Sequence, residues 1–371
     1  MLLELEGFAR DGLLRNLEGF ARPGVHTSDA KGETLLSFAT NDYLGLAEAP
    51  LTAPGAPSAA ASRLVTGTLQ EHDAAERELA SHVGQPAALL FTAGYAANVG
   101  TLAALLGPDD LVLSDALNHA SLIDGVRLSP ARATRYPHLD LDTVEHHLAR
   151  RPRDQTAWVI SETLFSMDGD APDLPALHQL CERYGAHLYL DEAHSYGVCG
   201  PEGAGLCAAY GIRPDVLLGT LGKAMGLQGA FIASSIPVRD YLVHRARSFV
   251  FSTGLSPLIA ASVPDRVKRI RRMEKERQHA HALCARLREG LQQRGWSVLG
   301  GPGLVTSVVI GDANTAVRAA EDLRRQGIVA KAIRPPTVPE GTSRLRLVVG
   351  AAHVASDIER LLESLGAAGS R

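Results

Sequence analysis

The sequence predicts an α/β protein with a mostly parallel central sheet and a smaller C-terminal α+β domain. Short continuous apolar runs alternate with helical stretches, a pattern typical of parallel strands that are buried on both faces. Three of these runs, at residues 158–161, 188–191 and 216–219, follow one another roughly 30 residues apart, which is the size of a βαβ unit. After residue 255 the pattern changes to long charged helical stretches and short strands.

The N-terminal part is predicted to contain one helix, one strand and one loop. Residues 1–25 are predicted to form an amphipathic helix, because leucines and a phenylalanine recur at helical spacing between charged residues. Residues 35–38 are predicted to form a short strand that is followed by a polar turn. Residues 48–61 are rich in Pro, Ala and Gly and are predicted to form a surface loop.

Two further strands are predicted before the three that define the sheet, at residues 87–91 and 111–114. Helices are predicted at residues 95–106 and 174–184, between successive strands. Strands and helices that alternate in this way build the parallel sheet of an α/β domain.

The C-terminal part is predicted to contain one long amphipathic helix, two strands and two further helices. These are residues 264–293 for the long helix, 305–310 and 345–349 for the strands, and 315–326 and 355–365 for the other helices. We therefore expect an N-terminal segment over residues 1–45, a large α/β domain over 46–262 and a small C-terminal α+β domain over 263–371.

Composition excludes several classes of protein. Of the 371 residues, 45% are hydrophobic and 21% are charged, which excludes a chain dominated by disorder. The formal net charge is −4, so the chain lacks the positive field that would hold a nucleic-acid backbone.

The four cysteines, Cys181, Cys199, Cys207 and Cys284, form no C-x-x-C pair. This spacing argues against a zinc finger or a disulfide scaffold and favours a reducing compartment. The N-terminus has no basic region followed by an apolar stretch, so we expect no secretory signal. We expect a cytoplasmic protein with no membrane span.

Lys223 is the first candidate for chemistry. It is one of only five lysines, and it alone lies in an uncharged, glycine-rich stretch directly after an apolar strand. A partly buried lysine loses its proton readily, and the neutral amine can form a Schiff base. Ligands of α/β sheets bind at the carboxyl ends of the strands, which favours a functional role over an exposed loop lysine or a simple phosphate contact.

The second candidate is the Asp-Glu-Ala-His motif at residues 191–194, which follows another apolar strand. Asp191 could pair with a cationic ligand, or Asp191 and His194 could hold a metal ion. Metal is the weaker interpretation, because no second cluster at metal-ligand spacing accompanies the motif.

Two further motifs follow strands. The small-residue turn at residues 92–98 opens a helix and could present backbone amides to an anion, although the motif by itself is better explained as a plain turn. His119 could be an ordinary surface histidine or a flat side chain for stacking. A Schiff-base lysine, a carboxylate for a ring nitrogen, an amide cradle and a stacking side chain are together what pyridoxal phosphate (PLP) requires.

Seven motifs follow one another along the chain, at residues 41–45, 62–67, 118–121, 165–170, 191–197, 220–223 and 333–347. In these motifs the chain resembles the fold-type-I PLP enzymes and, among them, the α-oxoamine synthases. The resemblance extends over nearly the whole chain and implies a PLP-dependent acyltransferase. It departs from the family at Ala93, where a serine is frequent, and in the loop before Ser62, which is short and lacks glycine repeats.

The resemblance also implies roles for individual residues. PLP would form a Schiff base with Lys223, pair through its ring nitrogen with Asp191, and stack on His119. The remaining cofactor contacts would come from Gly94, Tyr95, Ser166, His194, Thr220, Ser252 and Thr253, of which Ser252 and Thr253 would reach the partner subunit of a homodimer. Substrate contacts would come from Arg15, Asn41, His119, Arg334, Thr337 and Arg346, with Arg346 on the amino-acid carboxylate.

Within the family, the stretch from Ile333 to Leu347 resembles the members that condense L-alanine with a pimeloyl thioester. The alternatives in the same family are the condensation of glycine with acetyl-CoA or with succinyl-CoA. Alternatives of other classes are a non-catalytic phosphate-binding protein and a zinc hydrolase built on Asp191 and His194.

Overall fold

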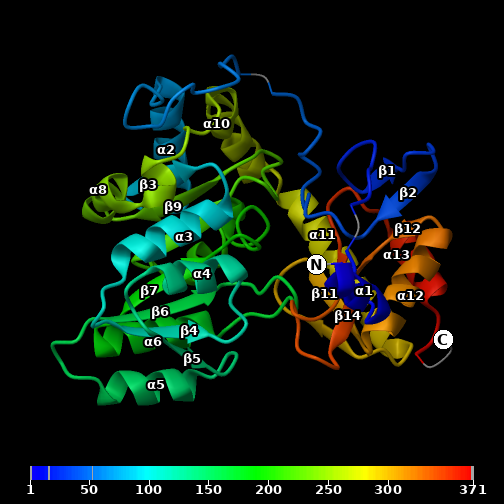
Figure 1. Cartoon of the computed structure of the whole chain (residues 1–371). Helices are drawn as coiled ribbons and strands as arrows, with labels where there is room; N and C mark the ends of the chain where they lie inside the picture. Colours follow the sequence, from blue (N-terminus) through cyan, green and yellow to red (C-terminus); the bar gives the residue numbers. More distant parts are fainter. Residues whose placement is uncertain (1, 16, 52, 369–371) are drawn as a thin grey trace. The chain divides into compact units, whose positions relative to one another are not determined.

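The computed structural model describes residues 2–15, 17–51 and 53–368 (Figure 1). The chain forms two compact units. The large unit comprises Pro50–Phe165 and Ala171–Glu274, and the small unit comprises Met1–Ala49, Ser166–Asp170 and Lys275–Arg371. The domain boundaries at residues 45 and 262 stay a prediction.

The large unit contains a seven-stranded sheet in the order β3-β9-β8-β7-β6-β4-β5. Its strands are β3 (Ala87–Phe91), β4 (Leu111–Asp115), β5 (Ala133–Tyr136), β6 (Ala157–Glu162), β7 (His187–Asp191), β8 (Val216–Thr220) and β9 (Ala230–Ser234). The pairs from β5 through β8 are all parallel, whereas β9 runs antiparallel to both of its neighbours. The predicted fold class and the parallel arrangement of the three defining strands are confirmed.

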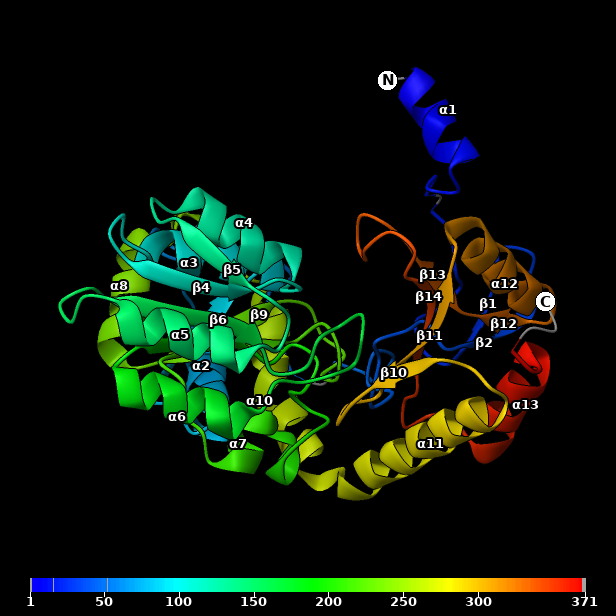
Figure 2. The same ribbon diagram turned by 90° about the horizontal axis from the view of Figure 1, so that it is seen from below.

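Helices cover both faces of this sheet. They are α2 (Gln70–His82), α3 (Gly94–Leu105), α4 (Ala120–Leu128), α5 (Leu141–Arg150), α6 (Leu174–Tyr184), α7 (Leu206–Tyr210), α8 (Ile236–Arg245), α9 (Arg247–Val250) and α10 (Pro257–Arg272), with a short 3₁₀ turn at Pro201–Gly203. Figure 2 shows α3 and α4 on one side of the sheet and α6 and α7 on the other. Apolar side chains of α3, including Leu102, pack on the sheet and make one contiguous core with it.

The small unit contains two sheets. The first is β10-β11-β14-β13, all antiparallel, with bounds Val298–Gly300, Val305–Gly311, Ser343–Val348 and Lys331–Ile333 in that order. The second is β1-β2-β12, with bounds His26–Ser28, Thr34–Ser37 and Ile328–Val329. The helices are α1 (Leu2–Arg10), α11 (Glu274–Gln293), α12 (Ala313–Arg325) and α13 (Ala355–Leu365).

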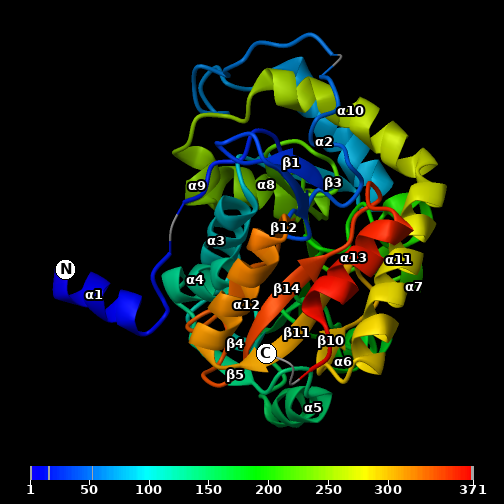
Figure 3. The ribbon, with the colours of Figure 1, turned by 90° about the vertical axis from the view of Figure 1, so that its right-hand side faces the viewer.

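Helices of the small unit pack closely on their neighbours. Figure 3 shows α12 alongside β14, and α12 contacts both β13 and β14. A Cβ atom on Gly290 of α11 would lie 2.4 Å from Cδ1 of Leu362 in α13, so the glycine allows these two helices to approach closely. The mixture of helices and antiparallel strands confirms the α+β fold predicted for the C-terminal part.

Two helix predictions are wrong in their extent. The first helix ends at Arg10 rather than near residue 25, and Gly12 follows in the left-handed region at φ +66°. None of the side chains in α1 is buried, so its apolar pattern does not mark a core-facing helix. The long helix predicted over residues 264–293 is in fact α10 and α11, which are separated at Met273, where the backbone amide bonds to the carbonyl of Ile270.

The loop predicted over residues 48–61 is confirmed for its described residues, which form no helix or strand. Thr52 lies outside the described residues. Among the helices that the structure describes, none combines the length and apolar character needed to cross a membrane.

Candidate active site

The carboxyl ends of β7 and β8 place two of the predicted residues in the large unit. Asp191 is the last residue of β7 and is buried, and it pairs in register with Leu218 of the neighbouring parallel strand β8. Lys223 follows the end of β8 by three residues and is half-buried. Both therefore lie at the edge of the sheet where α/β proteins bind their ligands.

Lys223 has a histidine partner. Its Nζ atom lies 2.6 Å from Nε2 of His194, which is buried in the loop after β7. A contact of this length between two nitrogen atoms is a hydrogen bond, so at least one of the groups carries a proton that the other accepts. The amine is thus held in place beside a group that can exchange protons with it.

The carboxylate of Asp191 is held on both oxygens. Nδ2 of Asn98 donates to Oδ2 over 2.8 Å, and the backbone amide of Ala193 donates to Oδ1 over 2.8 Å. A carboxylate offers about four lone-pair positions, so each oxygen can accept one further donor. A protonated ring nitrogen is such a donor.

The N-terminus of α3 offers backbone amides to an anion. Ala93 occupies the N-cap position in an extended conformation and provides no side-chain cap for the first amides. A Cβ atom on Gly94 would meet no other atom within 4 Å, so the space beside these amides is open. Tyr95 is half exposed, and its hydroxyl donates to Asp124 over 2.5 Å, which raises the pKa of the phenol.

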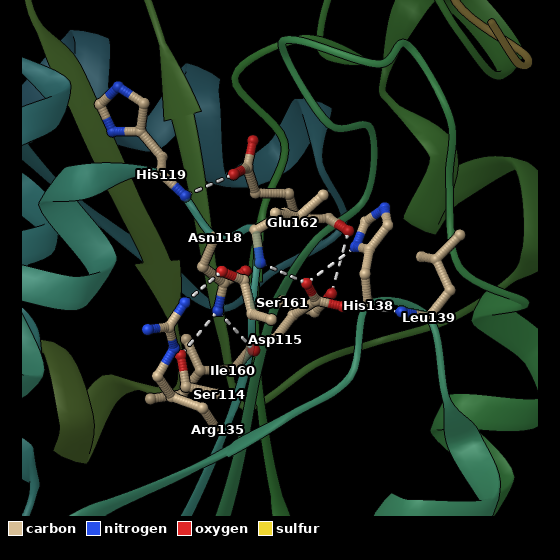
Figure 4. A network of polar contacts seen from close by, with 12 residues as sticks. Ser114, Asp115, Asn118, His119, Arg135, His138, Leu139, Ile160, Ser161 and Glu162 are labelled. Carbon is tan, nitrogen blue, oxygen red and sulfur yellow. Dashed lines mark hydrogen bonds and ion pairs between the residues drawn. The ribbon is translucent and has the colours of Figure 1, made fainter. Parts of the chain in front are cut away.

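His119 caps the N-terminus of α4 and lies exposed beside the end of β6 (Figure 4). Its Nδ1 atom bonds to the hydroxyl of Ser121 over 2.7 Å, and its backbone amide donates to Oε1 of Glu162 over 2.7 Å. Partial loss of hydration lowers the pKa of the imidazole, and the charge of Lys223 lowers it further, against the opposing charge of Asp191. The ring is therefore biased toward its neutral form.

Glu162 is a buried carboxyl group at the end of β6, and the sequence analysis did not single it out. Burial raises its pKa well above the usual range, and the negative charge of Asp191 on the adjacent strand raises it further. The only signal in the sequence was its position as the last residue of an apolar strand that lies parallel to the strand of Asp191.

The remaining predicted cofactor residues of the large unit lie on two segments. Thr220 ends β8, and its hydroxyl accepts a hydrogen bond from the amide of Gly222. Ser252 and Thr253 follow α9, where Thr253 pairs with Ser62 through an isolated antiparallel bridge. Thr253 is exposed and Ser252 is half-buried.

The small unit contains Ser166, Asn41 and Arg346, which the structure brings together. Arg346 on β14 is buried, and it donates from Nε to the carbonyl of Ser166 over 2.6 Å and from Nη2 to Oδ1 of Asn41 over 3.1 Å. A guanidinium has five N–H donors in a planar fork, so further donors remain for an acceptor such as a carboxylate.

Arg15, Arg334 and Thr337 also meet in the small unit. Nη2 of Arg15 donates to the hydroxyl of Thr337 over 3.3 Å. Arg334 donates to the carbonyl of Gly12, and partial burial together with the charge of Arg15 lowers its pKa. These three predicted substrate residues are therefore neighbours, although Arg15 is more than 300 positions before the other two in the sequence.

Asn98 is a further site residue that the sequence analysis missed. It is buried on α3, four residues after the predicted phosphate amides begin, and its amide contacts the carboxylate of Asp191. Helical spacing places residue 98 on the same face as residue 94, which was the only signal available in the sequence.

The chain is similar to known proteins over nearly its whole length. The family model described as aminotransferase class I and II matches residues 33–365. The 8-amino-7-oxononanoate synthase of Anaeromyxobacter dehalogenans is 45% identical over 374 residues, which cover 98% of this chain and 94% of the relative. The 8-amino-7-oxononanoate synthase 1 of a Polaromonas species is 45% identical over 360 residues, covering 92% of this chain and 88% of that protein.

A solved structure has the same fold over almost the whole chain. It is the serine palmitoyltransferase of S. paucimobilis with a bound PLP–myriocin aldimine, and it is 25% identical to this chain with a TM-score of 0.91. The alignment covers 98% of this chain and 95% of the transferase.

Proposed function

This chain belongs to the aminotransferase class I and II family, and we propose that it has the activity for which its curated relatives are named, 8-amino-7-oxononanoate synthase. The reaction condenses L-alanine with a pimeloyl thioester of coenzyme A or a carrier protein, and it yields 8-amino-7-oxononanoate, CO2 and the free thiol for biotin synthesis. The observation that carries this proposal is the 45% identity to such synthases along 98% of the chain.

The cofactor of this enzyme is PLP, and the large unit fits it. Lys223 would hold PLP covalently, Asp191 would accept from the ring nitrogen, and His119 would lie on the ring face. The uncapped amides at Gly94 and Tyr95 suit the phosphate group, because a helix N-terminus attracts anions. When bound, PLP supplies an electron sink that stabilises negative charge at the substrate Cα.

Different residues of the chain would transfer the proton and bind the substrates. We propose that the amine of Lys223 removes the proton from Cα of L-alanine and later returns one, with His194 holding the amine in position over the 2.6 Å contact. Arg346 would bind the carboxylate of L-alanine in the bidentate geometry that guanidinium groups favour. Asn41, Arg15, Arg334 and Thr337 would contact the substrates near it.

We further propose that the enzyme is a cytoplasmic homodimer in which Ser252 and Thr253 complete the phosphate site of the partner subunit. The exposure of Thr253 and of the adjacent Phe251, which is 71% exposed, supports a role for this segment at a subunit interface. All four cysteines lie within the described residues, where they are buried and form no disulfide, as is usual in a reducing compartment.

The test is thiol release by the PLP-loaded protein from pimeloyl-CoA, with L-alanine and with glycine, beside a reaction with acetyl-CoA and glycine. We expect thiol release and 8-amino-7-oxononanoate, detected by mass spectrometry, only when pimeloyl-CoA and L-alanine are both present. Release mainly from acetyl-CoA with glycine would assign the chain to a different condensation in the same family. A protein that retains no chromophore after borohydride treatment with PLP would contradict the cofactor chemistry itself.

A further inference from the structure

Asn98 lies at the centre of a buried hydrogen-bond network in the large unit. Its Nδ2 atom donates to Oδ2 of Asp191 and to Oγ of Ser121, each over 2.8 Å. Its Oδ1 atom accepts from the hydroxyl of Tyr189 over 2.6 Å. Asn98 is 1% exposed, so its two amide hydrogens and its carbonyl oxygen are all satisfied by protein groups.

The partners fix the orientation of the Asn98 amide. Both oxygens of Asp191 accept hydrogen bonds, Oδ1 from the amide of Ala193 and Oδ2 from Asn98, so the NH2 group of Asn98 faces Asp191. The phenolic hydroxyl of Tyr189 then donates to the carbonyl oxygen on the other side. The direction of each hydrogen bond in the network is therefore fixed, and every donor faces an acceptor.

The hydrogen bonds to His119 have a fixed direction as well. Ser121 receives one hydrogen bond from Asn98, so its own hydroxyl hydrogen is available for Nδ1 of His119, which lies 2.7 Å away. The backbone amide of Ser121 also donates to Nδ1, over 3.2 Å. Two donors on Nδ1 leave the proton of a neutral imidazole on Nε2.

Close packing of two helices makes the network possible. A Cβ atom on Gly125 of α4 would lie 2.9 Å from the carbonyl oxygen of Asn98 on α3, so the two helices approach more closely there than a side chain would allow. Ser121 is one turn before Gly125 on α4 and is thereby brought to the Asn98 amide.

We propose that Asn98 is a positioning residue that holds the carboxylate of Asp191 and, through Ser121, the ring of His119 in one fixed arrangement for PLP. The proposal rests on the proposed function only in taking Asp191 and His119 as the contacts to PLP. The amide of Asn98 then fixes the position of the Asp191 carboxylate, which would accept from the ring nitrogen, and the tautomer of the His119 imidazole. Replacing Asn98 should therefore disturb both of these contacts to PLP at once.

The test uses Asn98→Ala and Asn98→Asp in the full-length protein, with two readouts besides activity. These are the dissociation constant for PLP and the pH midpoint of the visible absorption band of the bound cofactor. We expect PLP binding to weaken by ~10-fold to ~100-fold, as for other partners that orient a ligand-binding group. We also expect the midpoint to move by about half a pH unit or more, because Asp191, the proposed partner of the ring nitrogen, loses a hydrogen-bond donor.

Two variants separate positioning from a general loss of packing. Asn118→Ala is the matched control, because Asn118 is also buried and its Nδ2 also donates twice, to Ser114 and to the carbonyl of Ile160. We expect it to leave the midpoint at the wild-type value (Figure 4 shows its contacts). Ser121→Ala breaks only the branch to His119 and is expected to keep the wild-type midpoint while it weakens PLP binding.

The outcome that overturns the proposal is a wild-type midpoint and dissociation constant in both Asn98 variants, or equal changes in Asn98→Ala and Asn118→Ala. If the Asn98 variants fail to fold, Tyr189→Phe takes their place, because it removes only the donor to Oδ1 of Asn98. It is expected to move the midpoint in the same direction, and an unchanged midpoint overturns the proposal. A wild-type protein that binds PLP but makes no 8-amino-7-oxononanoate contradicts the proposed substrates and leaves this inference standing.

Discussion

Asp191 ends one strand and Lys223 follows the neighbouring parallel strand, and each could be identified from its own stretch of sequence. An apolar strand followed by a lysine among glycines, or by an acidic residue, is a local pattern. Their partners could not be identified in this way. His194 was predicted as a cofactor contact, but its 2.6 Å hydrogen bond to Lys223 joins residues 29 positions apart and depends on how the two loops pack.

The first prediction concerns Lys223. Replacing it with Ala removes both the covalent attachment of PLP and the proposed base at the substrate Cα, so we expect thiol release to fall by ~1000-fold or more. Borohydride treatment should then fix no chromophore on the protein. Lys268→Ala is the control, because Lys268 is exposed on α10, and it should retain full activity. Substantial turnover by the Lys223→Ala protein would exclude the proposed role.

The second prediction concerns the buried carboxyl group of Glu192. Burial raises its pKa from 4.5 to about 7, although Ser195 and the amide of Cys207 donate to it. Between these pH values the folded protein binds one more proton than the unfolded chain, so the free energy of unfolding falls as the pH rises. The expected loss is about 3 kcal/mol between pH 4.5 and pH 7.

The measurement is the free energy of unfolding of the PLP-free protein against pH, for the wild type and for Glu192→Gln. The glutamine does not titrate, so the curve of this variant should lack the decline that Glu192 causes. Glu340→Gln, at an exposed position, should follow the wild type. Parallel curves for the wild type and Glu192→Gln would show that Glu192 does not change its protonation in this range.

Among the elements, the predicted strands and four of the six predicted helices lie close to their predicted positions, whereas helices such as α2, α4 and α5 were not predicted. The strand over residues 87–91 and the helix over 174–184 have the predicted bounds. An apolar run bounded by turn residues marks the strand, and the N-cap Asp173 and the C-cap Gly185 mark the ends of the helix, so both signals are local. The break at Met273 gave no such signal, since charged and apolar residues continue through it at helical spacing. The reversed direction of β9 is likewise set by its neighbours in the sheet.

The third prediction concerns the N-terminus of α3. Serine is a good N-cap residue in the extended conformation that Ala93 adopts, and it contributes ~0.5–2 kcal/mol relative to alanine. We therefore expect Ala93→Ser to raise the free energy of unfolding of the PLP-free protein by about 1 kcal/mol in denaturant titrations. Ala93→Val has no cap oxygen and should bring no such gain. A serine variant no more stable than the wild type would mean that these amides are already satisfied.

At the scale of the molecule, neither compact unit is formed by one continuous stretch of the chain. Residues 166–170 belong to the small unit although the residues on both sides belong to the large one. Contacts with the small sheet hold this segment, since Ser307 donates to the carbonyl of Met167 over 2.5 Å and Arg344 forms an ion pair with Asp168. These contacts join residues about 140 to 180 positions apart, which no local pattern can predict.

The fourth prediction concerns the ion pair of Arg344 and Asp168, both of which are buried. Removing one partner leaves a buried charge, so Arg344→Met is expected to lower the free energy of unfolding by ~3–5 kcal/mol. The double variant Arg344→Met with Asp168→Asn removes both charges and should recover part of this loss. Equal stability of the single and double variants in denaturant titrations would show that the charges do not interact.

Local sequence was sufficient for the fold class, for most strands, for four of the helices, and for placing Asp191 at the end of its strand and Lys223 just after another. Backbone preference and apolar periodicity act over a few residues, so a short stretch of sequence is enough to recognise them. Long-range packing decided the strand order, the reversal of β9, the transfer of residues 166–170 to the small unit, and the network around Asn98. Asn98 and Asp191 are 93 positions apart, and only the packing of α3 against the sheet brings their side chains within hydrogen-bond distance.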